Sequence, residues 1–178
     1  MYFDKAGKRN TEQTLRLAKE RAQALGLTKV VLASSNGFTA RKALQVFQDT
    51  DIQLIVVGTS RAEFHQDVFT ILEQKEIPVR FSAEVEYVYP EVVRNAYRKM
   101  SEGMKVVMDL GMIVGEEGLA ADNEEVVAVG GTGPRGFTEG GGADTAVVML
   151  PLKHEDFAKV PETKDNRRDI KEIICKPR

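Results

Sequence analysis

The sequence predicts an α/β protein, a three-layer α/β/α sandwich around a mostly parallel sheet. Short apolar, β-branched runs alternate along the chain with stretches whose apolar residues recur at helical spacing. The runs are apolar at nearly every position, which is typical of strands that helices cover on both faces. The chain has 178 residues, 42% of them hydrophobic, which is enough for one such domain over residues 1–178.

In the first half of the chain, helices and strands alternate. Asn10 or Thr11 can cap a first helix whose apolar positions are Leu15, Ala18, Ala22 and Leu25, and Gly26 stands where a terminating glycine is expected. The pattern then predicts a strand at 30–33, a helix from about 39 to 48, a strand at 52–57, a helix at 68–72 and a short strand at 79–82.

In the second half, Pro90 can open a helix through Met100, with Val92, Val93, Ala96 and Tyr97 as its apolar residues. Methionines at 100, 104, 108 and 112 recur at helical spacing, and we expect a buried helix over 104–114. Its glycines at 103, 111, 115 and 118 mark close packing or the approach of a ligand. Strands are expected at 126–129, 145–150 and 170–175, with an additional strand at Tyr2-Phe3 and a charged surface excursion over 153–169.

The composition limits the partners that we expect. The net charge of −2 gives no global field that would attract nucleic acid or an anionic membrane. The single cysteine, Cys175, is expected to be a buried, inert thiol, and the absence of a signal sequence or long apolar span predicts a cytoplasmic protein. His65 and His154 are isolated, so no metal is expected. Homo-oligomerisation stays open.

The loop after the first strong strand has the pattern of an anion site. Ser34, Ser35, Asn36 and Gly37 precede a helix that Phe38 and Thr39 would begin, so the N–H groups of residues 37–39 would lack partners within the helix. The serines and Thr39 can add hydroxyl donors, and Gly37 can adopt a positive φ. An ordinary N-cap and turn would use the same residue types.

A second polar, glycine-rich cluster follows the fourth strand and contains Gly130, Gly131 and Thr132. Residues 131–136 match Gly-x-Gly-x-x-Gly, but glycines at 140–142 lead directly to another strand, so we reject a dinucleotide fingerprint. A flap over 130–144 that closes on a ligand and a plain hairpin loop both fit. Asp144 and Thr145 read as a turn pair or as ligand contacts.

The N-terminal stretch supplies further candidate contacts. Lys5, Asn10 and Thr11 precede a helix, and they would add a cation and an amide to the pocket if they lie beside Ser34, although capping explains Asn10 and Thr11 equally well. Both polar, glycine-rich clusters follow strands of a parallel sheet, so we expect them at its carboxyl edge, where such sheets bind ligands.

The order of these motifs resembles the C-terminal domain of pyruvate kinase. The similarity covers residues 28–151 and rests on the stretches 30–40, 103–118, 125–132 and 145–148. The motifs at 2–3, 10–12, 33–35, 127–131, 142–148 and 172–175 resemble small free-standing archaeal and bacterial proteins of that superfamily. The resemblance implies a three-layer fold in which Ser34, Ser35, Gly37 and Thr39 hold a phosphate.

The same resemblance implies a ligand, for which flavin mononucleotide (FMN) is the expectation. Pyruvate kinase activity is not expected, because the catalytic barrel is absent. The leading hypothesis is a binding domain for a phosphorylated small molecule. The alternatives are a flavin-dependent oxidoreductase, an enzyme that acts on a phosphorylated metabolite, and a scaffolding subunit that exposes its methionine-rich segment 104–114.

Overall fold

The computed structural model describes residues 1–86, 90–133, 141–155 and 169–178. Its elements are β1 (Tyr2–Phe3), the short 3-10 helix η1 (Lys8–Asn10), α1 (Thr11–Leu25), β2 (Lys29–Ala33), α2 (Phe38–Val46), β3 (Gln53–Gly58), α3 (Gln66–Gln74), β4 (Val79–Phe81), α4 (Glu91–Met100), α5 (Glu102–Glu116), β5 (Val126–Gly130), β6 (Thr145–Met149) and β7 (Ile170–Pro177). The helices and strands expected from the sequence are all present. Most of the charged excursion and the centre of the flap lie outside the described residues.

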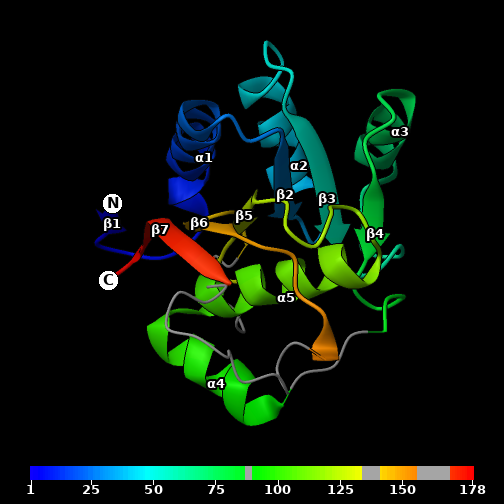
Figure 1. The fold of residues 1–178 in the computed structure, drawn as a ribbon. Coiled ribbons are helices and arrows are strands. Elements are labelled where there is room, and N and C mark those ends of the chain that lie inside the picture. The colour runs from blue at the N-terminus through cyan, green and yellow to red at the C-terminus, as the bar shows by residue number, and fades with distance from the viewer. Residues whose placement is uncertain (87–89, 134–140, 156–168) are drawn as a thin grey trace.

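The strands form one sheet in the order β1-β7-β6-β5-β2-β3-β4. Parallel pairs join β1 to β7, β2 to β3 and β5, and β3 to β4, whereas β6 is antiparallel to both of its neighbours. The sheet is therefore mostly parallel, as predicted. The pairing of β1 with β7 brings the N-terminal and C-terminal segments together (Figure 1).

Helices cover both faces of the sheet, which confirms the three-layer α/β/α sandwich (Figure 1). Alternate residues of each strand point to opposite faces: Val30 and Leu32 pack with the cluster that includes α1, α2 and α3, whereas Val31 packs with α5. Helix α4 lies outside α5 and contains no buried residue. Its apolar positions therefore contribute less to the core than their spacing suggests.

The methionine-rich helix α5 packs directly on the sheet. Met104, Met108 and Met112 are fully buried, as expected, whereas Met100 at the end of α4 is 42% exposed. The alternative of a scaffolding subunit that exposes residues 104–114 is therefore wrong, because this segment is part of the hydrophobic core.

The glycines of α5 allow other parts of the chain to approach it closely. A Cβ at Gly103 would overlap the Thr145 hydroxyl, and a Cβ at Gly115 would overlap the carbonyl of Leu152. Gly118 instead has a positive φ of 60° just after the helix. In α5, glycine marks close packing.

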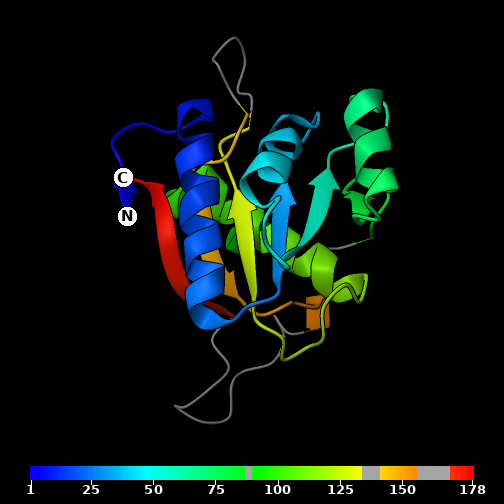
Figure 2. The same ribbon diagram turned by 90° about the horizontal axis from the view of Figure 1, so that it is seen from above.

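The central strands β2 and β5 lie side by side, with Leu32 paired to Val129. Their carboxyl ends therefore meet at one edge of the sheet (Figure 2). From β2 the chain continues through α2 to β3 on one side, and from β5 it continues to β6 on the other. This is the reversal of strand order at which open α/β sheets bind ligands.

Candidate functional site

The first predicted loop joins β2 to α2 at this edge of the sheet. Gly37 has a φ of 99°, which is the positive value expected for it. Ser34 is buried, its N–H donates to the Val57 carbonyl at 2.8 Å, and its Oγ accepts the Ala40 N–H at 3.1 Å. The Ser34 side chain therefore caps α2 from within the protein.

The main-chain amides of the loop divide into paired and unpaired groups. The Phe38 N–H, expected to be free, donates to Asn36 Oδ1 at 3.1 Å in a local turn. The N–H groups of Ser35, Asn36, Gly37 and Thr39 have no acceptor among the described residues. These four donors lie where the α2 dipole places partial positive charge.

The second predicted loop continues the hairpin between β5 and β6. The Asp144 N–H donates to the Gly130 carbonyl at 3.1 Å, and the Gly141 N–H donates to the Thr132 carbonyl at 2.9 Å. Gly130 itself packs against α5, since a Cβ there would contact the Gly103 carbonyl and the Val106 side chain. The two hydrogen bonds join the described ends of the flap to each other.

The two loops enclose a small cavity of about 150 Å³. None of its described lining residues is acidic. The lining consists of Ala33, Ser35, Asn36, Phe38, Thr39, Val106, Gly131, Gly133, Gly141 and Gly142. The predicted clusters therefore lie together, with Ser35, Asn36, Phe38, Thr39 and Gly131 facing one space. Ser34, Gly37, Gly130, Thr132, Asp144 and Thr145 support this space without lining it.

Thr39 has an unusual environment in this cavity. The residue is only 2% exposed and lines the cavity, and its hydroxyl has no hydrogen-bond partner among the described residues. Its oxygen is not among the described side-chain atoms that are both fully buried and without a partner. A polar ligand group or a water in the cavity can therefore bond to this hydroxyl.

Asp144 is fully buried and accepts hydrogen bonds from three parts of the chain. Its Oδ2 accepts the Gly7 N–H at 2.8 Å, the Thr132 hydroxyl at 2.8 Å and the Thr132 N–H at 3.3 Å. Its Oδ1 accepts the Thr145 hydroxyl at 2.9 Å. Of the two interpretations open from the sequence, the geometry favours structural anchoring for Asp144 and Thr145, because protein donors already occupy the carboxylate.

The N-terminal candidates also serve mainly as supports. The Asn10 side chain donates to the Lys5 carbonyl at 2.7 Å, and Thr11 Oγ1 donates to the Lys8 carbonyl at 2.7 Å while accepting the Ala143 N–H at 3.0 Å. Lys5 is exposed, and its described hydrogen bond uses the main chain. Lys8 instead lies beside the cavity, with its ammonium 4.2 Å from the centroid of the Phe38 ring. No signal in the sequence favours Lys8 over Lys5, because only tertiary contacts distinguish the two lysines.

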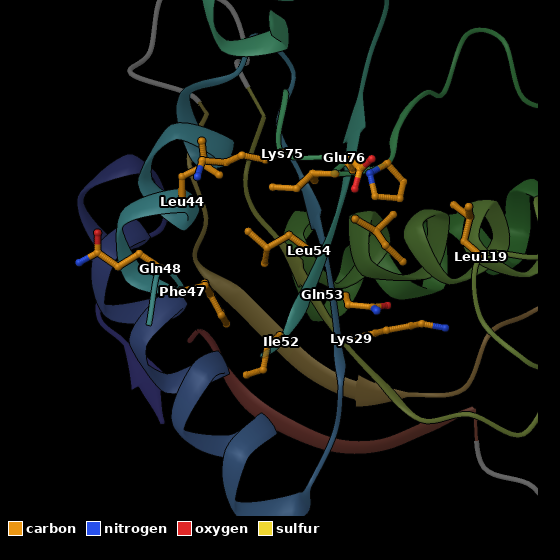
Figure 3. Close-up of a pocket in the computed structure, with 13 residues that line it drawn as sticks. Lys29, Leu44, Phe47, Gln48, Ile52, Gln53, Leu54, Lys75, Glu76 and Leu119 are labelled. Carbon is orange, nitrogen blue, oxygen red and sulfur yellow. The ribbon is translucent and has the colours of Figure 1, made fainter. Parts of the chain in front are cut away.

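A larger cavity, of about 510 Å³, lies at the opposite edge of the sheet, near the amino ends of β2 and β3 (Figure 3). Apolar side chains from α2 and β3, such as Leu44 and Leu54, form part of its wall, and Lys29, Lys75 and Glu76 add charges. Lys29 pairs with Glu124 at 2.9 Å, so its charge is compensated within the protein. This cavity contains none of the residues predicted as a site.

Cys175 is buried next to the anchoring network. Burial raises the pKa of its thiol to about 11, against the smaller, opposite effects of hydrogen bonds to Thr14 and the Ala146 main chain. At neutral pH the thiol is therefore protonated and a poor nucleophile. The described residues contain no cluster of acidic, histidine and cysteine side chains that could hold a metal, and none of their helices combines the length and hydropathy of a membrane span.

A comparison with known protein families finds no match for this chain. Among solved structures, the chain is similar to Cryptosporidium parvum pyruvate kinase in complex with ADP, with 15% sequence identity and a TM-score of 0.43. The alignment covers 80% of this chain and 24% of that enzyme's chain, so this chain corresponds to about a quarter of that length.

Proposed function

We propose that this chain binds a phosphorylated small molecule, with FMN as the expected ligand, and that the phosphate lies against the N-terminal end of α2. The observation that carries the proposal is the hydroxyl of Thr39, which has no hydrogen-bond partner among the described residues, in a cavity rimmed by unpaired main-chain N–H groups. A phosphate offers several strong acceptors, and a helix N-terminus with free amides is a natural place to bind it.

The charge of the cavity supports an anion. Its described lining residues include no carboxylate, while the α2 dipole and the N–H groups of Ser35, Asn36 and Gly37 supply positive potential. A cation would find no countercharge among these residues. The cavity therefore suits a phosphate better than an ammonium or a metal ion.

The size of the cavity limits which part of the ligand it holds. Sites that enclose a drug-sized molecule usually measure about 300–1,000 Å³, whereas this cavity measures about 150 Å³. It can hold a phosphate with a few further atoms, so the rest of a nucleotide such as FMN would extend beyond it. Phe38 and Val106 provide apolar surface at the wall for the adjoining atoms.

The geometry supports binding over catalysis. No described lining residue is an aspartate, glutamate, histidine, lysine or cysteine, so the cavity itself provides no general acid or base. A flavin would bring its own redox chemistry. Turnover can be tested in the same sample as binding, by recording the flavin absorbance while a nicotinamide donor is added. Sustained bleaching of the flavin would favour the oxidoreductase alternative.

The decisive experiment is a titration of the full chain with FMN, compared between the native protein and Thr39→Val. Valine keeps the shape of threonine but cannot donate to a phosphate, so affinity should fall at least tenfold, since a hydrogen bond to a charged group contributes about 1.5–3 kcal/mol. Stability should stay close to that of the native protein, because valine keeps the shape of the buried residue and the hydroxyl makes no hydrogen bond to a described residue. Thr70→Val, at an exposed position on α3, is the matched control.

A second variant tests the location of the ligand by filling space. Gly133 lines the cavity, and a Cβ added there meets no atom within 4 Å. Gly133→Leu should therefore keep the fold and block FMN. Failure of the native chain to bind either FMN or inorganic phosphate, or unchanged affinity in both cavity variants, would overturn the proposal.

A further inference from the structure

Lys8 places a positive charge at the edge of the candidate cavity. It begins η1, and its ammonium lies over the ring of Phe38, which lines the cavity. Lys8 forms no ion pair with a carboxylate among the described residues. Its charge is therefore held by an aromatic face, which attracts a cation less strongly than an anion would.

The main chain of Lys8 is fixed against the second loop of the site. Gly142, another lining residue, lies so close that a Cβ on it would come within 2.7 Å of Lys8 Cα. Thr11 Oγ1 joins the Lys8 carbonyl to the Ala143 N–H, and Asp144 holds the Gly7 N–H immediately before Lys8. From this anchored main chain, the Lys8 side chain reaches the ring of Phe38, which lines the cavity.

We propose that Lys8 is the countercharge for a dianionic ligand and makes the site selective for a terminal phosphate monoester. This inference rests on the proposed function. A phosphate monoester carries a charge of about −1.5 to −2 at pH 7 because its second pKa is about 6. A phosphodiester or pyrophosphate linkage carries one charge on each phosphorus, and a neutral analogue carries none. A small cavity with free amides and one adjacent lysine matches the monoester best.

The test compares three flavins that share one ring system: FMN with a terminal phosphate, FAD with a pyrophosphate linkage, and riboflavin with neither. The native chain should prefer FMN over both. Lys8→Met keeps the length of the stem over Phe38 and removes only the charge, so it should weaken FMN about tenfold and leave riboflavin unchanged. Lys8→Arg should retain most of the FMN affinity, and Lys5→Met serves as the charge-matched control.

The pH profile separates a charge contact from a merely structural role. Native affinity for FMN should fall as the pH drops from 7.5 to 5, because the phosphate gains a proton near pH 6. In Lys8→Met this fall should be smaller, because the residue that favours the dianion is gone. A structural defect would lower affinity equally at both pH values.

The outcomes distinguish this inference from the proposal on which it depends. Native protein that binds none of the three flavins, and no inorganic phosphate, overturns the proposed function together with the role of Lys8. Native protein that binds FMN while Lys8→Met binds it equally well, with the same pH profile, overturns the role of Lys8 alone. If Lys8→Met loses FMN and riboflavin binding to the same extent, and unfolding curves show that the variant is folded, the role of Lys8 as a countercharge is also overturned.

Discussion

The carboxylate of Asp144 accepts a hydrogen bond from the main-chain N–H of Gly7 at 2.8 Å, across 137 residues of sequence. This bond joins the N-terminal loop to the start of β6, and both flank the candidate cavity. Thr132, two residues after the end of β5, donates to the same oxygen. One buried side chain thus holds together the segments that carry Lys8, Gly131 and Gly142.

Removal of the Asp144 carboxylate should destabilise the protein strongly. Asp144→Ala leaves the buried Gly7 N–H and Thr145 hydroxyl and the half-buried Thr132 hydroxyl without their acceptor. Each unsatisfied buried group costs about 1–3 kcal/mol, so we expect a loss of about 3 kcal/mol or more in the free energy of unfolding.

Asp144→Asn is the matched variant for this prediction. Its oxygen can replace Oδ2, and the Thr145 hydroxyl can turn to accept from the new NH₂ group. It should therefore lose clearly less stability than Asp144→Ala in urea unfolding. Equal stability of native protein and Asp144→Ala would show that the network does not anchor these segments.

Alanine variants of Ser34 and Ser35 should separate folding from binding. The Ser34 hydroxyl accepts the Ala40 N–H, so Ser34→Ala should cost about 1 kcal/mol of stability, as for the loss of other helix caps. Ser35 is exposed and lines the cavity, so Ser35→Ala should stay within about 0.5 kcal/mol of native stability.

Ligand affinity should show the reverse order. Ser35→Ala should reduce FMN affinity several-fold through the loss of a donor, whereas Ser34→Ala should affect affinity less than it affects stability. Thermal unfolding and FMN titration of both variants check this. If Ser34→Ala lost the ligand but kept native stability, the Ser34 hydroxyl would have to face the ligand and not Ala40.

The sequence predicted the layers, the helices and the strands because each depends on local periodicity, which the chain shows clearly. It also predicted that the two polar loops share one edge of the sheet, since parallel strands end together. It could not predict that Lys8, and not Lys5, reaches Phe38, because both are exposed lysines between β1 and α1 and only tertiary contacts distinguish them. For the same reason, the spacing of apolar residues in α4 did not reveal that the helix lies outside the core.

The glycines of α5 should differ in their tolerance of a methyl group. A Cβ at Gly115 would overlap the main-chain carbonyl of Leu152, which cannot rotate away, whereas a Cβ at Gly111 would meet the flexible end of Met149. Overpacking usually costs about 1–3 kcal/mol, and alanine regains about 1 kcal/mol of helix propensity. We therefore expect Gly115→Ala to lose stability and Gly111→Ala to stay within about 1 kcal/mol of native in urea unfolding. The opposite order would contradict the close approach of Leu152 to α5.

Stability should fall at alkaline pH because of Cys175. Burial raises the pKa of the folded thiol from 9.0 to about 11, so above pH 9 the unfolded chain loses this proton while the folded protein keeps it. The stability that the protonated, buried thiol contributes is fully present below pH 9 and is lost as the pH rises toward 11. The loss amounts to about 1 kcal/mol at pH 10. Cys175→Ala lacks this group, so its free energy of unfolding should decline less than that of the native protein between pH 8 and pH 10. Other groups also titrate in this range, and the difference between the two proteins isolates the thiol. Parallel declines, or rapid reaction of the folded native protein with a thiol reagent at pH 8, would show that Cys175 is not shielded by the fold.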